Sequence, residues 1–265
     1  LARRYREPVP AGSKPWNDVL AGMLAHRTVR AYLPDPLPKG TLELLVAAGQ
    51  SAPSTSNMQV WSVVAVKDPA RKAALAKVTG GQAHVTQAPM VLVWLADLNR
   101  IESVAKARGM TLETLGFTES FLMASLDAAF AAQNAVVAAE SLGLGTCYLG
   151  SLRNDTEEVA RILELPQGCY GVFGLTVGFP DPKVQTDVKP RLPQEAVLHH
   201  ETYGQASQAE AISRYDTHML AFKREQGQDN QPWTDQTLAR LATIPALKGR
   251  HILRQALQRL GFPQT

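Results

Sequence analysis

The chain has 265 residues, of which 45% are hydrophobic and 19% are charged, and its formal net charge is +3. This is an ordinary globular composition, long enough for one large domain or two small ones. The two cysteines, Cys147 and Cys169, make no disulfide framework and are expected to be free thiols. No long Lys/Arg run or interleaved aromatic stripe is present, so we expect no nucleic-acid partner, and the mild positive charge slightly favours small anionic ligands.

The start of the chain is polar and charged. Residues 1–13 are predicted to form an irregular arm, and no apolar run follows Arg6 that would indicate a secretory signal. We therefore expect a cytoplasmic protein. Ser13 as an N-cap and Pro15 near the first turn then predict a helix that ends at residues 26–30.

The spacing of apolar residues predicts the elements that follow. In chain order, they are a helix at 41–50, a strand at 60–66, a short helix at 69–78 and a mostly apolar central strand at 89–96. Two loops of unusual composition lie among them, the hydroxyl-rich 51–57 and the glycine turn 79–82.

A long apolar helix is the central prediction. It runs from Leu112 to Leu142 and would span roughly 45 Å at 1.5 Å per residue. Alanines keep it thin, so that other helices can approach closely, and its polar residues form one narrow line. Charges and amides interrupt the apolar surface, so we expect no membrane span and no membrane partner. The polar line comprises Ser120, Asp127, Asn134 and Ser141.

The second half of the chain follows from the end of this helix at Gly143-Leu144-Gly145. The predicted elements are a strand at 146–150, a helix at 155–165, a strand at 170–179, a loop at 180–193, a helix at 206–225 and, after a polar break at 227–232, a final amphipathic helix to about Leu260. No internal repeat or long linker is present. The prediction is one α+β domain over residues 1–265, with a helical C-terminal extension over about 206–265.

Four short segments combine cations, hydroxyls and glycine turns. They are His26-Arg27-Thr28-Val29-Arg30, Ser54-Thr55-Ser56, Gly80-Gly81-Gln82 and Lys189-Pro190-Arg191. Cationic side chains, hydroxyls and free backbone N–H groups together suit an anionic phosphate ligand. Each segment alone also has an ordinary explanation, since a basic pair complements a helix dipole and a Ser/Thr run is commonly a solvated turn. The phosphate hypothesis therefore depends on these segments meeting in space.

Other kinds of site are less well supported. Gly143-Leu144-Gly145 follows a helix, which is the reverse of a dinucleotide-binding loop. His199 and His200 are adjacent and on a strand would point to opposite faces, so no metal is expected. The sequence contains no Walker loop and no Gly-x-Ser-x-Gly elbow. Cys147 has no activating partner evident in the sequence and is predicted to be a core residue.

Taken in order, these segments resemble the FMN-dependent nitroreductase superfamily, and more narrowly its NADPH-linked, oxygen-insensitive nitroreductase and flavin reductase group. The matching segments are 26–30, 54–59, 79–85, 132–145, 148–154 and 189–193. The resemblance extends from about residue 16 to 204, and loosely to the end. It implies an antiparallel-rich sheet wrapped by helices, with the long central helix in a homodimer interface. It also implies one FMN per active site, touched by both chains.

The resemblance further implies roles for individual residues. The FMN phosphate would be held by His26, Thr28, Lys189 and Arg191. Arg30 would approach the pyrimidine side of the ring, where a fixed guanidinium raises the flavin potential. Ring and ribityl atoms would be bound by Ser54, Ser56, Gln59 and Gln82. The backbone of Leu149, Gly150 and Ser151 would lie along the flavin, with the N–H of Gly150 or Ser151 near N5.

The implied activity is the transfer of two electrons from NAD(P)H to nitroaromatics, quinones or free flavin by a ping-pong mechanism. The chemistry takes place at flavin N5, and no catalytic side chain is expected. A flavin-binding or regulatory module of the same fold without turnover is an alternative hypothesis, and an unrelated α+β protein that binds another phosphate-bearing ligand is a third.

Two departures from the group are evident. In the segment 222–232, where the group often places arginines for NADPH, only Lys223 and Arg224 are basic. These two are the candidates for the nicotinamide nucleotide, and the preference between NADPH and NADH stays open. Asn57 and Trp61, near the hydroxyl-rich loop, are the second departure.

Overall fold

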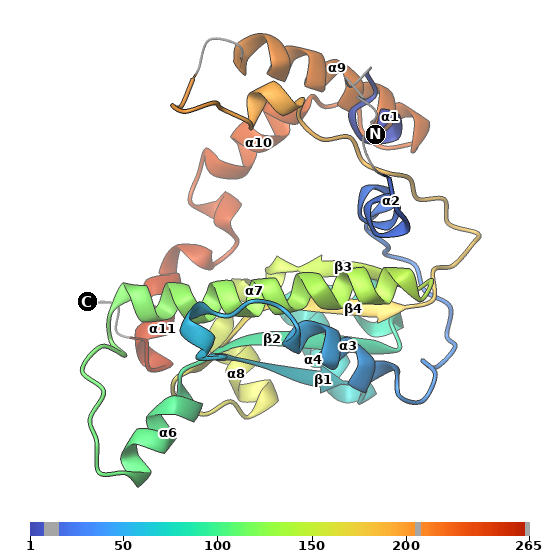
Figure 1. Ribbon diagram of the computed structural model, residues 1–265. Helices are drawn as coiled ribbons and strands as arrows, with labels where there is room; N and C mark the ends of the chain where they lie inside the picture. Colours follow the sequence, from blue (N-terminus) through green and yellow to red (C-terminus); the bar gives the residue numbers. More distant parts are fainter. Residues whose placement is uncertain (8–15, 205–207, 263–265) are drawn as a thin grey trace. The chain divides into compact units, whose positions relative to one another are not determined.

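The computed structural model describes residues 1–7, 16–204 and 208–262 (Figure 1). The chain divides into two compact units. Unit 1 comprises Leu1–Arg27 and Pro182–Leu247, and unit 2 comprises Thr28–Asp181 and Lys248–Thr265.

Unit 2 is built on a four-stranded sheet in which every neighbouring pair is antiparallel. The strand order is β1-β2-β4-β3, so β2 and β4 are central. The strands are β1 (Trp61–Val66), β2 (Met90–Asp97), β3 (Gly145–Leu149) and β4 (Cys169–Gly178). All four predicted strands are confirmed, and every residue of β2 is buried, as expected of a central apolar strand.

Helices cover both faces of this sheet. The apolar residues of β2 point alternately to the two faces, so each face needs a layer of helices to bury it. Leu92 and Trp94 face one core, whereas Val91 and Val93 face the other. The first face carries α3 (Thr41–Gln50) and α7 (Thr118–Ser141), and the second carries α4 (Pro69–Val78), α5 (Ala83–Gln87) and α8 (Thr156–Leu163). The predicted α+β architecture, an antiparallel sheet wrapped by helices, is confirmed.

The long helix α7 begins later than predicted, at Thr118 rather than at Leu112. The residues before it form a turn, in which the Thr114 carbonyl accepts hydrogen bonds from Phe117 N (3.1 Å) and Ser120 Oγ (2.7 Å). The alanines of α7 that face the sheet are almost fully buried, as the prediction of a thin helix required.

The polar line of α7 is explained by its neighbours in unit 2. Asp127 Oδ1 accepts hydrogen bonds from Thr55 N (2.9 Å) and Thr55 Oγ1 (3.1 Å), and Asn134 Nδ2 donates to Ala48 O (3.3 Å). By length and composition alone α7 could cross a membrane. Its packing on the sheet and its buried Asp127 instead identify it as a core helix.

Unit 1 is helical in its described residues, with α1 (Ala2–Tyr5), α2 (Asp18–Ala25), α9 (Gln208–Glu225) and α10 (Trp233–Leu241). The irregular arm predicted for residues 1–13 therefore contains a short helix. Helix α2 begins after Asn17, whose side chain accepts a hydrogen bond from Leu20 N (2.9 Å). Ser13 and Pro15, the predicted start of this helix, lie outside the described residues, as does residue 206, the predicted start of α9.

The single final helix predicted up to Leu260 is wrong. The chain forms α10, then short 3-10 turns at Pro245–Leu247 and Arg250–Ile252, and then α11 (Leu253–Arg259). Pro245 lacks a backbone N–H, and Gly249 has a φ of 90°, so neither continues a helix. Helix α11 belongs to unit 2, where Phe262 packs edge-on against Phe121 and Tyr170. Helix α5 and helix α6 (Asn99–Ala107) were not predicted.

Candidate functional site

Two predicted segments of unit 2 meet at Gln82 and Ser151. Gln82 precedes α5, and Ser151 lies in η2 (Gly150–Asn154), the 3-10 turn that follows β3. Gln82 Nε2 donates to Ser151 Oγ (2.9 Å) and to Thr79 O (2.9 Å), which fixes the orientation of the amide. Leu149 is buried, and Gly150 is half-buried. The structure thus brings the glycine turn 79–82 against the segment 149–151.

Thr28 and Arg30 lie beside β3. Val29 N donates to Thr146 O (2.9 Å), and Thr28 forms a parallel bridge with Thr146, the second residue of β3. The exposed side chain of Arg30 affects the pKa values of two buried groups, the Cys147 thiol and the His84 imidazole. Burial raises the pKa of the Cys147 thiol, and the charge and hydrogen bond of Arg30 oppose this shift. Burial, and then the charge of Arg30, lower the pKa of His84. Cys147 is a buried residue, as predicted.

The hydroxyl-rich loop is held to α7 by Thr55, not by the serines. Ser54 Oγ accepts a hydrogen bond from Gln59 N (3.0 Å), while Ser56 is exposed. Ser56, Asn57 and Gln59 have φ angles of 49°, 54° and 52°. This left-handed conformation is uncommon without glycine and concentrates at functional sites. Within the described chain, no hydrogen bond joins this loop to Gln82 or Ser151.

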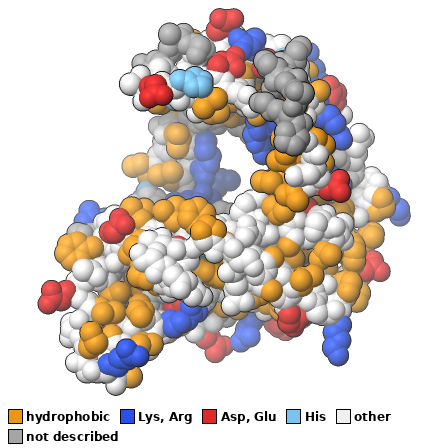
Figure 2. Space-filling view, in the orientation of Figure 1, with side chains coloured by type: hydrophobic (Ala, Val, Ile, Leu, Met, Phe, Trp, Pro, Cys, Tyr) orange, Lys and Arg blue, Asp and Glu red, His pale blue; other side chains and the backbone are white. Residues whose placement is uncertain are grey.

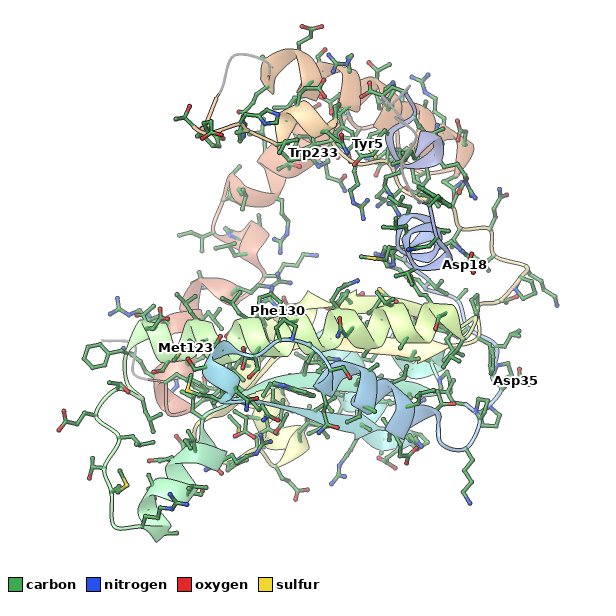
Figure 3. The ribbon with its side chains drawn as sticks, in the orientation of Figure 1. Tyr5, Asp18, Asp35, Met123, Phe130 and Trp233 are labelled. Carbon is green, nitrogen blue, oxygen red and sulfur yellow. The ribbon has the colours of Figure 1, made fainter. Side chains whose placement is uncertain are left out.

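The cationic candidates of unit 1 come together around Arg4. The Arg4 guanidinium donates to Lys189 O (2.7 Å) and to His26 O (2.8 Å). Arg191 N in turn donates to Arg4 O (3.0 Å). The side chains of Lys189 and Arg191 are exposed, and His26 is half-buried. Figure 3 labels Tyr5 on α1 and Asp18 at the start of α2, the two helices that carry this cluster or lead into it.

Arg4 was not a candidate from the sequence. It is flanked by Arg3 and Arg6 in a charged arm, and no spacing or motif distinguishes the three. Only the structure shows that Arg4 is buried, with an exposed fraction of 6%, while Arg3 and Arg6 form ion pairs with Asp187 and Glu225.

The two candidates for binding the nicotinamide nucleotide, Lys223 and Arg224, form hydrogen bonds with the loop that follows α9. Lys223 is buried, and its Nζ donates to Asp229 Oδ1 (2.9 Å) and Gln231 O (2.8 Å). Arg224 Nε donates to Asn230 Oδ1 (3.0 Å). Both side chains therefore hold the segment that follows α9 against the end of that helix.

The two unusual residues near the hydroxyl-rich loop have structural contacts. Trp61 packs against Trp94 with a distance of 5.4 Å between the ring centroids, so its ring joins the core under α7. Asn57 Oδ1 accepts a hydrogen bond from Gln59 Nε2 (3.2 Å) and braces the loop from within.

Comparisons with known proteins identify the family of the chain. The model of the nitroreductase family matches residues 23–179, and that of the nitroreductase family C-terminal domain matches residues 189–265. An FMN reductase [NAD(P)H] of Bacillus subtilis (strain 168) is 36% identical over 250 residues, which cover 93% of this chain and 98% of that protein. An oxygen-insensitive NADPH nitroreductase of Salmonella typhimurium is 36% identical over 223 residues, covering 83% and 88%.

Solved structures show the same relationship. The structure of the hypothetical oxidoreductase YcnD from Bacillus subtilis superposes with a TM-score of 0.88 at 34% identity. The superposition covers 94% of this chain and 99% of that one.

Proposed function

This chain belongs to the nitroreductase family, and from this premise we propose that it is an FMN-dependent oxidoreductase that transfers two electrons from NAD(P)H to small-molecule acceptors. The observation that carries the proposal is the assembly of Gln82 with Ser151 beside Gly150 in unit 2, and of His26 with Lys189 and Arg191 in unit 1. Bound FMN supplies the redox chemistry by taking hydride from the nicotinamide at N5 and passing two electrons to the acceptor.

The cationic candidates of unit 1 suit the phosphate of a flavin. Lys189 and Arg191 present exposed cations from one loop whose backbone is fixed, and His26 stands beside that loop. Cations on a fixed backbone suit a phosphate dianion. They form the proposed phosphate-binding set of unit 1, and Thr28 of unit 2 is a further proposed contact of the phosphate.

The ring-binding set is proposed to lie in unit 2. The amide of Gln82 is oriented by Thr79 and Ser151, and Arg30 adds an exposed cation for the pyrimidine side of the ring. Gly150 has no side chain to obstruct approach to N5. Backbone from Leu149, Gly150 and Ser151 would lie along the flavin. Polar contacts to ring or ribityl atoms would come from Ser54, Ser56, Gln59 and Gln82.

We propose nitroaromatics, quinones and free flavin as acceptors in a ping-pong cycle, because reductant and acceptor both need the same face of the flavin. Lys223 and Arg224 are the basic residues of the segment 222–232, and their donors already hold the loop. A cation used in this way is a weak ligand for a 2′-phosphate, so we expect NADH to compete with NADPH as reductant.

A second copy of the chain is proposed to cover α7. Leu122, Leu126 and Phe130 repeat along one side of this helix with exposed fractions of 45%, 50% and 45%. Hydrophobic side chains are visible on the surface over α7, and Phe130 is labelled in the side-chain view (Figures 2 and 3). A row of large exposed apolar side chains marks an interaction surface. We propose a cytoplasmic homodimer, which sedimentation at several concentrations would test.

The experiment that tests the activity is a visible absorption spectrum of the purified protein, repeated after anaerobic addition of NADPH or NADH in separate cuvettes. We expect a two-banded yellow spectrum that bleaches with either nucleotide. Bound FMN that neither nucleotide bleaches would indicate a flavin-binding module without turnover. A colourless protein that does not quench the fluorescence of added FMN would contradict the whole proposal.

A further inference from the structure

Arg4 occupies an unusual position for an arginine near a chain terminus. Its exposed fraction is 6%, and its guanidinium donates to the carbonyl oxygens of Leu24 (2.9 Å), His26 (2.8 Å) and Lys189 (2.7 Å). Arginine is among the residues that are almost never fully buried unless paired. Three backbone acceptors at these distances from one planar group indicate a specific structural task.

The first part of that task concerns the end of α2. The last carbonyl groups of a helix have no partner within the helix and carry a partial negative charge. Leu24 lies in the last turn of α2, and His26 is its C-cap. An anion placed beside His26 would therefore face the unfavourable end of a helix. By donating to both carbonyls, Arg4 satisfies these acceptors and offsets their negative charge.

The orientation of the peptide after His26 follows from the same contact. In a trans peptide, the C=O and N–H bonds point in opposite directions, and no peptide bond of the described chain is cis. Because the His26 carbonyl points at Arg4, the N–H of Arg27 points away from it. The contact with Arg4 therefore fixes the direction of this backbone donor, a group that can serve an anion site.

The second part of the task concerns the loop that carries Lys189 and Arg191. Arg4 holds this loop on both sides of Pro190, since its guanidinium donates to Lys189 O and its carbonyl accepts from Arg191 N (3.0 Å). Tyr215 Oη donates to Pro190 O (3.1 Å) and fixes the residue between them. The backbone of this loop is therefore held in place. The side chains of Lys189 and Arg191 are exposed, and Arg191 Nη1 donates to Lys189 O and Pro190 O (3.2 Å each).

We propose that Arg4 is the positioning residue of the phosphate-binding set: it joins His26 to the Lys189–Arg191 loop and neutralises the end of α2. This inference rests on the proposed function, because it assumes that the bound anion is the FMN phosphate. Arg4 acts through these residues and need not touch the phosphate. Its loss therefore weakens recognition of the phosphate and not of the flavin ring.

Comparison of FMN with riboflavin, which has the same ring and no phosphate, tests this role. The affinities of the apoprotein for both flavins are measured by fluorescence quenching in wild type, Arg4→Ala and Arg3→Ala. The control is matched, because Arg3 is the neighbouring residue of α1, carries the same charge and forms an exposed ion pair with Asp187. Arg4→Ala is expected to weaken FMN binding by roughly tenfold to a hundredfold and to leave riboflavin binding nearly unchanged. Arg3→Ala should change neither.

The affinities for FMN and riboflavin separate a failure of the Arg4 role from a failure of the proposed function. Equal losses for FMN and riboflavin in Arg4→Ala, or an FMN loss no larger than that of Arg3→Ala, would overturn the positioning role and leave the proposed function intact. A wild-type protein that binds neither flavin would overturn the proposed function itself. If Arg4→Ala does not fold, Arg4→Lys serves instead. It keeps the charge but cannot reach three carbonyls from a fixed plane, so a selective loss for FMN supports the role, and unchanged FMN affinity contradicts it.

Discussion

The two units hold their candidate residues in different ways. In unit 2, the segment after β3 rests on apolar side chains, since Leu149 and Leu152 are almost completely buried against β4 and α8. In unit 1, the apolar cluster is small and consists of Tyr215, Met219 and Phe222, with Leu192 and Trp233 packed against it. The loop that carries Lys189 and Arg191 is held there by hydrogen bonds from Arg4.

This contrast predicts which property a single substitution changes in each unit. An apolar core distributes its stabilisation over many contacts, so losing one hydrogen bond at its edge changes local geometry more than it changes folding. Where one buried cation serves three carbonyls, its removal leaves all three without that donor at once. We therefore expect stability to respond most to apolar changes in unit 2, and phosphate recognition to respond most to polar changes in unit 1.

The largest expected effect on stability is that of Leu152→Ala. Leu152 has an exposed fraction of 0%, and its Cδ1 would lie 2.9 Å from a Cβ placed on Gly174, so the site is tightly packed. Truncating such a leucine leaves a cavity, which costs about 2–5 kcal/mol. Urea unfolding measures the change. Leu238→Ala, at a side chain with an exposed fraction of 69%, is the control and should change stability by less than about 0.5 kcal/mol.

Arg250→Ala is expected to have a smaller effect that is local to η2. Arg250 Nε donates to Asn154 Oδ1 (2.9 Å), and Asn154 Nδ2 donates to Val78 O (3.2 Å). The C-terminal segment thereby braces the turn that carries Gly150 and Ser151. A Cβ on Gly249 would lie 2.6 Å from Asn154 O, so the backbones also approach closely here. We expect a loss of about 1–2 kcal/mol, with faster amide hydrogen exchange at residues 150–154.

The matched control for Arg250→Ala is Arg259→Ala. Arg259 lies in α11, and its ion pair with Glu157 is exposed on both sides, so its removal should cost no more than about 1 kcal/mol. Equal exchange rates at residues 150–154 in the two variants would show that Arg250 does not brace the turn.

Lys189→Ala and Gln82→Leu compare the proposed phosphate-binding set of unit 1 with the proposed ring-binding set of unit 2. We expect Lys189→Ala to weaken FMN binding by roughly tenfold, with little change for riboflavin, because one cation is lost from the phosphate set. Gln82→Leu removes an oriented amide and should weaken FMN and riboflavin alike. Titrations at two salt concentrations separate them further, since only the contribution of Lys189 is screened. The reverse pattern would show that the phosphate and the ring were assigned to the wrong residues.

Asp97 predicts a small pH effect in unit 2. Burial by itself raises the pKa of this carboxyl, but hydrogen bonds from Ser62 and Cys169 and the charge of Arg100 lower it below its ordinary value. A lowered folded-state pKa stabilises the protein above the unfolded value of about 3.9. That contribution is lost as the pH falls through the folded-state pKa. Urea unfolding from pH 6 down to pH 3 should show a decline that is shallower in Asp97→Asn. Equal slopes would contradict this assignment.

The domain prediction stays open to a direct measurement. A single domain over residues 1–265 predicts one calorimetric transition, in which both units unfold together. Two transitions would show that units 1 and 2 are separate domains. In that case, Leu152→Ala should shift only one of the two.

Much of the fold could be predicted because it depends on local pattern. Burial on both sides made β2 continuously apolar, and the alanines and apolar residues of α7 made a long buried helix recognisable. The ends of the helices could not be predicted as well from the sequence. The turn before Thr118 and the breaks at Pro245 and Gly249 depend on which hydrogen bonds the chain finds, and an apolar spacing continues through them unchanged.

The fold class and the four strands could be predicted from the sequence, because the burial of a strand is reflected in the pattern of neighbouring residues. How the segments proposed to contact the flavin are held depends on the tertiary structure. Gln82 and Ser151 are 69 positions apart, and Arg4 and Lys189 are 185 apart, yet each pair shares a hydrogen bond. Which of several similar arginines becomes buried depends on the path of the whole chain. For that reason, Arg4 could be found only once the carbonyls of Leu24, His26 and Lys189 were seen around it.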